Sequence, residues 1–163
     1  MLNKICLVPA IMILSIVILS PSILANERHI QVSLFTPVQI FPEGDIITGL
    51  RINILYGRNT TVKGLDIGLV NHTTSGISKG LQYGFVGIVD ADFVGWQDNA
   101  VNIVNQNFEG FQSGIVNYAH YASGFQLGFV NYAASMKGLQ IGLVNIIKQG
   151  GAFPVFPIVN WSF

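Results

Sequence analysis

One eight-residue phrase recurs through the middle of the chain. It reads GLDIGLVN at 64–71, GLQYGFVG at 80–87, GFQSGIVN at 110–117, GFQLGFVN at 124–131 and GLQIGLVN at 138–145. A weaker copy, GWQDNAVN, lies at 95–102, and GLRIN at 49–53 looks like an eroded first copy, so the leading glycines are 14 to 16 residues apart. A fixed period indicates that one structural unit is copied and stacked. It also argues against an enzyme, because catalysis needs different residues gathered at one place.

Each phrase has the side-chain alternation of a β-strand. In the copy at 138–145, Leu139, Ile141 and Leu143 point to one side, and Gln140 and Val144 point to the other together with two glycines. Two glycines in so short a segment would destabilise a helix by about 1 kcal/mol each. The looser residues between the phrases fit a compact hairpin link that ends in the next leading glycine.

Residues 1–25 have the pattern of a secretory signal peptide. Lys4 precedes an apolar run at 5–19, and small residues follow up to Ala25. The run is shorter than the roughly 20 residues of a spanning helix, so we expect cleavage after Ala25. Cys6 would leave with the signal, and residues 26–163 would form a single β-repeat domain without cysteine. The lack of disulfides favours a bacterial envelope protein over a eukaryotic extracellular domain.

The C-terminal segment 153–163 resembles the last strand of bacterial outer-membrane β-barrels. Counting back from Phe163, apolar side chains alternate at Trp161 and Val159. In that family the last strand closes the barrel, which is what the resemblance implies here. Pro154 and Pro157 depart from the pattern, because proline cannot donate a hydrogen bond to a neighbouring strand.

The chain carries few charges. Only 10% of its residues are charged, against roughly 25% in soluble domains. Without Lys4, 7 basic and 8 acidic residues remain, which gives no electrostatic attraction for nucleic acid. Much of the surface must therefore be neutral, or must face lipid or a partner.

We therefore predict an all-β fold: a small antiparallel up-and-down β-barrel of about eight strands, built from ~15-residue repeats, in the outer membrane. The seven repeats plus segments 29–41 and 153–163 give nine candidate strands, and bacterial barrels have an even number, which favours eight. The Leu/Phe/Ile side would face outer-membrane lipid, and the Gly/Gln side would fill the interior. The polar side chains that would face the lumen are Arg51, Asp66, Gln82, Gln112, Gln126 and Gln140.

A parallel β-solenoid stays open as the alternative. Near-identical repeats joined by links of nearly equal length would place identical residues side by side. In that case we expect the Leu and Phe side chains to point into a narrow core. A ladder of asparagines would mark one corner, formed by Asn71, Asn102, Asn117, Asn131 and Asn145.

The repeat also resembles a family of bacterial surface-repeat proteins of unknown function. Members carry tandem Gly-[Leu/Phe]-Gln-x-Gly-apolar-apolar-Asn units behind a signal peptide, and the resemblance covers residues 49–149. It implies a location at the cell surface. It implies no site residues, because the family has no assigned mechanism.

Residue types that carry chemistry are scattered. The three histidines His29, His72 and His120 have no metal-ligand spacing. Asp90 and Asp92 lack the further oxygen ligands and the glycine turn of a calcium loop. We predict no catalytic residues, no metal and no cofactor.

Two departures from the repeat stand out. Asp66 replaces the usual Gln, and Asp98 replaces a mid-strand apolar residue. In a lumen they could pair with Arg51 or tune ion passage; the alternative is that they are exposed charges at loop ends. The predicted function is a non-enzymatic cell-envelope protein with a structural or surface-interaction role. The alternative is an exported soluble β-solenoid that acts as a binding or adhesive module, with Gly/Gln faces or exposed Leu/Phe stripes as contact surfaces.

Overall fold

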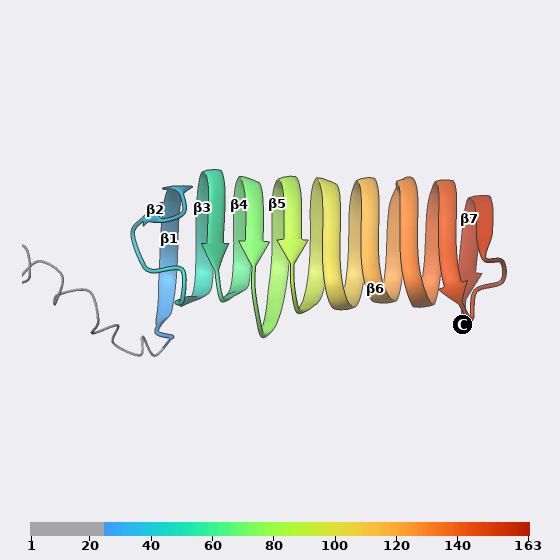
Figure 1. Ribbon diagram of the computed structural model, residues 1–163, viewed down its shortest axis with the longest axis horizontal. Helices are drawn as coiled ribbons and strands as arrows, with labels where there is room; N and C mark the ends of the chain where they lie inside the picture. The colour runs from blue at the N-terminus through green and yellow to red at the C-terminus, as the bar shows by residue number, and fades with distance from the viewer. Residues whose placement is uncertain (1–24) are drawn as a thin grey trace, which may run out of the picture.

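The computed structural model describes residues 25–163, so the predicted signal peptide lies outside the described residues except for Ala25. This part of the chain is one elongated coil of β-structure (Figure 1). One sheet runs in the order β2-β1-β3-β4-β5-β6-β7. Its strands are β1 (Glu27–Phe35), β2 (Val38–Gln39), β3 (Ile46–Asn59), β4 (Thr61–Thr73), β5 (Ile77–Val89), β6 (Asp92–Gln149) and β7 (Val155–Ser162).

Successive repeats pair in parallel and in register. Gly64 lies beside Gly49 on one side and beside Gly80 on the other, and Gly80 lies beside Gly95. Each repeat therefore makes one turn of a β-solenoid, and β6 winds through several turns (Figure 1). The all-β class is confirmed, and so is the solenoid alternative. The antiparallel barrel with hairpin links is wrong, because only parallel stacking lets each residue bond to its own copy in the next turn.

A glycine turns the chain at the start of each repeat. The φ angle is +125° at Gly124 and +144° at Gly138, a region that residues with a Cβ rarely adopt. A Cβ on Gly124 would also lie 2.1 Å from the carbonyl oxygen of Gly110, in the turn before. Gly49 and Gly95 have φ angles of +146° and +136°, so the eroded and the weak copies are genuine turns of the coil.

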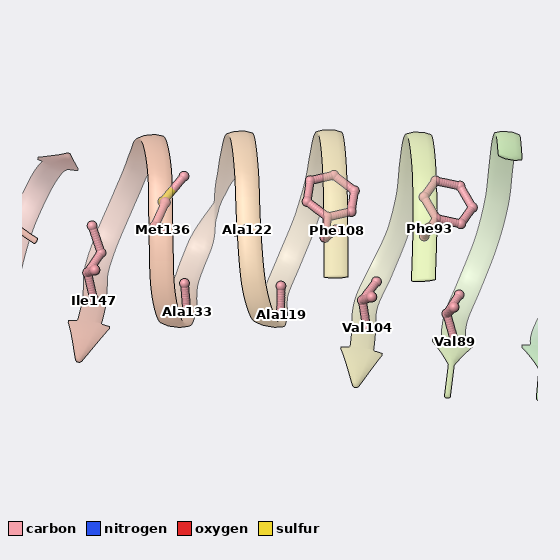
Figure 2. Packing of buried hydrophobic residues seen from close by; sticks show 9 residues of the cluster. All are labelled: Val89, Phe93, Val104, Phe108, Ala119, Ala122, Ala133, Met136 and Ile147. Atoms are coloured by element: carbon pink, nitrogen blue, oxygen red, sulfur yellow. The ribbon is translucent and has the colours of Figure 1, made fainter. Parts of the chain in front are cut away.

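The apolar core lies inside the second half of each repeat, between the asparagine position and the next leading glycine. Phe93 and Phe108 stack with ring centroids 6.3 Å apart. Figure 2 shows two rows along the coil axis, one of Phe93, Phe108, Ala122 and Met136, the other of Val89, Val104, Ala119, Ala133 and Ile147. The core is thin, because each turn adds only two apolar side chains to it.

The two ends of the coil are covered differently. At the N-terminal end β1 adds to β3 in parallel and β2 folds back on β1. At the C-terminal end β7 runs antiparallel to the last repeat, with Trp161 beside Leu139. A strand within 153–163 is confirmed, but its predicted role in closing a barrel is wrong. β7 is an edge strand, and Pro157 and the positive φ of Ile158 discourage further strand pairing there.

We predict that Gly124→Ala destabilises the solenoid by about 3 kcal/mol, because the new Cβ meets the backbone of the preceding turn and the φ angle is unfavourable. The midpoint of urea unfolding measures the effect. Gly44→Ala is the matched control, because a Cβ on Gly44 would meet no atom within 4 Å. Equal midpoints for the two variants would contradict the role of the corner glycine.

Candidate binding surface

The six polar side chains that were predicted to face a lumen lie inside the solenoid. Each is at most 3% exposed. They form one column together with Gln97, which the sequence analysis left out although the weak repeat carries Gln at the same position. Four glutamines donate from Nε2 to Oε1 of the glutamine one turn before, at 2.7–2.8 Å. Starting from the C-terminal side, the chain of donors and acceptors runs Gln140, Gln126, Gln112, Gln97 and Gln82.

Asp66 fixes the direction of this column. A carboxylate can only accept hydrogen bonds, so Gln82 donates to Asp66 Oδ2 at 3.0 Å and turns its own oxygen toward Gln97. On the other side Arg51 donates to both carboxylate oxygens at 2.7 Å. The pairing of Arg51 with Asp66 that the sequence analysis raised is therefore present, buried in a filled interior instead of a lumen.

A second column, of asparagines, runs in the opposite direction. Asn102 donates to Asn117, Asn117 to Asn131 and Asn131 to Asn145, each at 2.8 Å. These amides donate toward the C-terminus, whereas the glutamines donate toward the N-terminus, so the two sets of side-chain dipoles oppose each other. The predicted corner ladder is confirmed from Asn102 onward.

The asparagine column is interrupted at Gly87, and Asn99 in the next turn compensates for the missing side chain. Gly87 occupies an asparagine position, and Asn99 occupies a glycine position one turn later. The Asn99 side chain fills the space that a side chain at Gly87 would take, since a Cβ on Gly87 would lie only 2.6 Å from Asn99 Nδ2. Asn99 Nδ2 donates to Asn102 Oδ1 at 2.7 Å. Within the first repeat, Asn53 and Gly57 are exchanged in the same way. What looks like decay of the repeat is a paired exchange of side-chain volume.

The bulky side chains of the first half of each repeat point outward. Phe125, Leu127 and Phe129 are 46–57% exposed. The expectation that a solenoid would bury this side is wrong. Strand alternation allows only one side inside, and the glutamine and asparagine amides occupy it because they bond to partners in the neighbouring turns. Among residues 25–163 the amide oxygens of Asn53, Asn99 and Gln140 are buried without a partner. We call the outward side chains of the first halves, from Ile52 in β3 to Leu143 in β6, the apolar face.

The apolar face is large and almost uncharged. Turns spaced by ~4.8 Å and about six residues at ~3.3 Å each give roughly 30 by 20 Å, or about 600 Å², the size of the largest apolar patches on monomers. Asp98 is the only charged side chain on it among the described residues. The second halves of the repeats carry other charges, among them Lys79, Asp92, Glu109 and Lys137.

A groove of about 470 Å³ runs along the C-terminal half of the apolar face. Its floor is the backbone of Gly114, Gly128 and Gly142, which carries no outward side chain. Ser113 and Ile158 lie at its two ends, and its walls are Leu127, Ile141, Phe129 and Leu143. A shorter stretch of about 330 Å³ lies over Gly68 and Gly84. The turn that begins at Gly95 lines neither stretch, and it carries Asp98 and Ala100 at the positions of the bulky wall residues.

A polar spot adjoins the groove at this separating turn. Trp96 Nε1 donates to Ser113 Oγ at 3.1 Å, and Ser113 Oγ donates to Asp98 Oδ1 at 2.6 Å. The idea that Asp98 faces a lumen is wrong: it lies on the outer surface and is partly exposed. Within residues 25–163, Ser113 is its hydrogen-bond partner, which leaves Oδ2 available to a ligand.

The densest polar network elsewhere joins four successive turns. Tyr56 Oη lies 2.8 Å from His72 Nδ1, His72 Nε2 lies 2.8 Å from Asp90 Oδ2, and Asn105 donates to Asp90 Oδ1 at 3.1 Å. Asp92 separately accepts from Asn107. In the part of the chain that the structure describes, no three His, Cys, Asp or Glu residues are placed to hold a metal ion. The network therefore acts as a cross-link between turns.

Comparison with protein-family models, with curated proteins and with solved structures gives no match to this chain. The resemblance to bacterial surface-repeat proteins therefore stays a prediction. Among residues 25–163 there is also no helix long and apolar enough to cross a membrane.

We predict that Asp66→Gln alone costs about 3–5 kcal/mol, because it leaves the buried Arg51 guanidinium without its counter-charge. Adding Arg51→Gln should recover most of this loss, since two further glutamines extend the amide column. Urea unfolding of both single variants and the double variant gives the coupling energy. The exposed pair Arg58–Glu43, with an N–O distance of 3.4 Å, supplies the control: Arg58→Gln should cost at most about 1 kcal/mol. A double variant no more stable than Asp66→Gln would contradict the amide-column account.

Proposed function

We propose that this chain is an exported β-solenoid that acts as a non-catalytic binding or adhesive module, with the apolar face as its contact surface. The observation that carries the proposal is the inverted distribution of polarity. Gln112 and Gln126 are buried, whereas Phe125 and Phe129 stand in solvent. The apolar face is as large as the largest apolar patches on monomers, and such patches often mark interaction sites.

The energetics of covering this face are favourable. At about 25 cal/mol per Å², ~600 Å² of apolar surface corresponds to roughly 15 kcal/mol of gross driving force. Association costs about 4–15 kcal/mol in lost freedom and ordering. The entropy lost by ordering the apolar face on binding is small, because each of its strands is already hydrogen-bonded to the neighbouring turns. Its side chains are short-branched or aromatic and have few rotatable bonds. It is a rigid, preorganised surface.

Export is supported by the sequence pattern of residues 1–25. The repeats are held together by columns of hydrogen-bonded side chains, and residues 26–163 contain no cysteine that could form disulfides. The regular turns present the same kind of side chain every ~4.8 Å, which suits contact with an extended apolar surface. A structural or adhesive role at the cell surface follows from this combination.

We expect purified 26–163 to adsorb strongly to a methyl-terminated surface in a quartz-crystal microbalance. Leu127→Gln combined with Phe129→Gln should reduce the adsorbed amount at least tenfold, because both side chains are exposed and the interior columns stay intact. Tyr121→Gln is the matched control: this ring is 52% exposed on the second half of its repeat. Equal losses for both variants would rule out the apolar face as the contact surface.

We also expect the chain produced in a Gram-negative host to begin at Asn26 when recovered outside the cytoplasm. The small residue at Ala25 provides the cleavage position. Intact-mass measurement of the exported fraction tests this, and Ala25→Arg, which blocks cleavage, should retain the uncleaved form. Full-length chain in the cytoplasm alone would contradict export.

A further inference from the structure

We propose that the groove between Ser113 and Ile158 binds a single-chain cationic amphiphile, with its alkyl chain over the glycine floor and its cationic head over Asp98 and Trp96. This inference rests on the proposed function, since it assigns a ligand class to part of the apolar face. The two observations behind it are the shape of the groove and the charge of Asp98 beside it.

The groove fits an unbranched apolar chain. Its floor is bare backbone at Gly114, Gly128 and Gly142, and its walls are aliphatic or aromatic. Four strand spacings separate the turn of Asp98 from β7, or ~19 Å, which matches an extended dodecyl chain with a head group.

The charge beside the groove selects the head group. In the proposed complex the head group extends one turn beyond Ser113, over Asp98, and removes water from its carboxylate. A carboxylate that loses water without a counter-charge is destabilised, so neutral and anionic heads are disfavoured. Oδ1 is already bonded to Ser113, which holds the group in place, and Oδ2 can meet a cation.

Trp96 provides a second element of cation recognition. It lies two residues before Asp98, so both side chains emerge from the same side of the strand. Its indole is 45% exposed and is held by the bond to Ser113 and by the Phe111 ring, with centroids 5.8 Å apart. Aromatic faces attract alkylammonium groups within about 6 Å. A carboxylate and an indole on one surface thus form a receptor for a quaternary ammonium.

Ile158 closes the far end of the groove under strain. It is paired with Gly142, and its φ angle is +70°, an unfavourable value for a β-branched residue, while its side chain is 73% exposed. Strained residues tend to lie at ligand clamps. Here the strain aims an apolar side chain at the end of the glycine floor, where it would meet the terminus of an alkyl chain.

Isothermal titration calorimetry of 26–163 with dodecyltrimethylammonium and with dodecanoate, both below their micelle concentrations, tests the proposal. We expect about one site for the cation, at least tenfold weaker binding of the anion, and at least a tenfold loss for the cation in Asp98→Asn. Trp96→Leu, which keeps the carboxylate, should also weaken cation binding. Asp92→Asn changes net charge equally on the second half of its repeat and should leave binding unchanged.

The outcomes separate this proposal from the general one. If both amphiphiles bind equally, and Leu127→Gln with Phe129→Gln abolishes both, the apolar face is a docking surface but the cation assignment is overturned. An equal loss in Asp98→Asn and Asp92→Asn also overturns it, since net charge alone would then explain the effect. If neither amphiphile binds and the apolar-surface adsorption is also unaffected by the face variants, both proposals fail.

Discussion

The hydrogen bond between a buried amide and its own copy one turn away is the interaction on which this structure depends. Gln112 donates to Gln97 and accepts from Gln126, so the amides along the glutamine column bond to one another from turn to turn. This is possible only when repeats stack in parallel and in register, which excludes hairpins. Because an amide column fills the space beneath the first half of each repeat, the bulky residues of that half must stand outside. The fold and its exposed apolar face therefore have one cause.

The glutamine column ends in charged groups on its N-terminal side, whereas on its C-terminal side Gln140 Oε1 has no hydrogen-bond partner among residues 25–163. Asp66 can only accept and Arg51 can only donate, so together they terminate the glutamines and set their direction. In β1, on the N-terminal side of Arg51, the Gln31 side chain donates to the carbonyl oxygen of Phe41 and accepts from its backbone N–H. At the other end Asn160 in β7 bonds to the backbone of Phe153. The edge strands thus protect the two open ends of a fold that could otherwise continue to stack.

The departures from the repeat are of two kinds: some preserve the packing of the interior, and others change the outer surface. The exchange of Gly87 with Asn99 keeps the interior filled. The changes at Asp98 and Ser113 do nothing for the interior, since both side chains lie outside, and they place the only charge of the apolar face beside the groove. A repeat module gains a distinct site in this way: one turn differs from the others on its outer surface while its inner positions still match.

The sequence by itself determined the period, the strands, the leading glycines and the sidedness of each strand, because these depend on local alternation and on backbone freedom at residues such as Gly124. It also identified Arg51, Asp66 and the glutamines as one polar set. It did not decide between antiparallel and parallel pairing, since the same alternation suits both, and the apparent barrel signal at 153–163 favoured the wrong one. Only the tertiary structure decided that the interior amides bond to their own copies in neighbouring turns, that Gly87 is paired with Asn99, and that Asp98 and Trp96 both bond to Ser113 beside a groove. These depend on which residues neighbouring turns bring together, and that register is a property of the stacked coil and not of any single repeat.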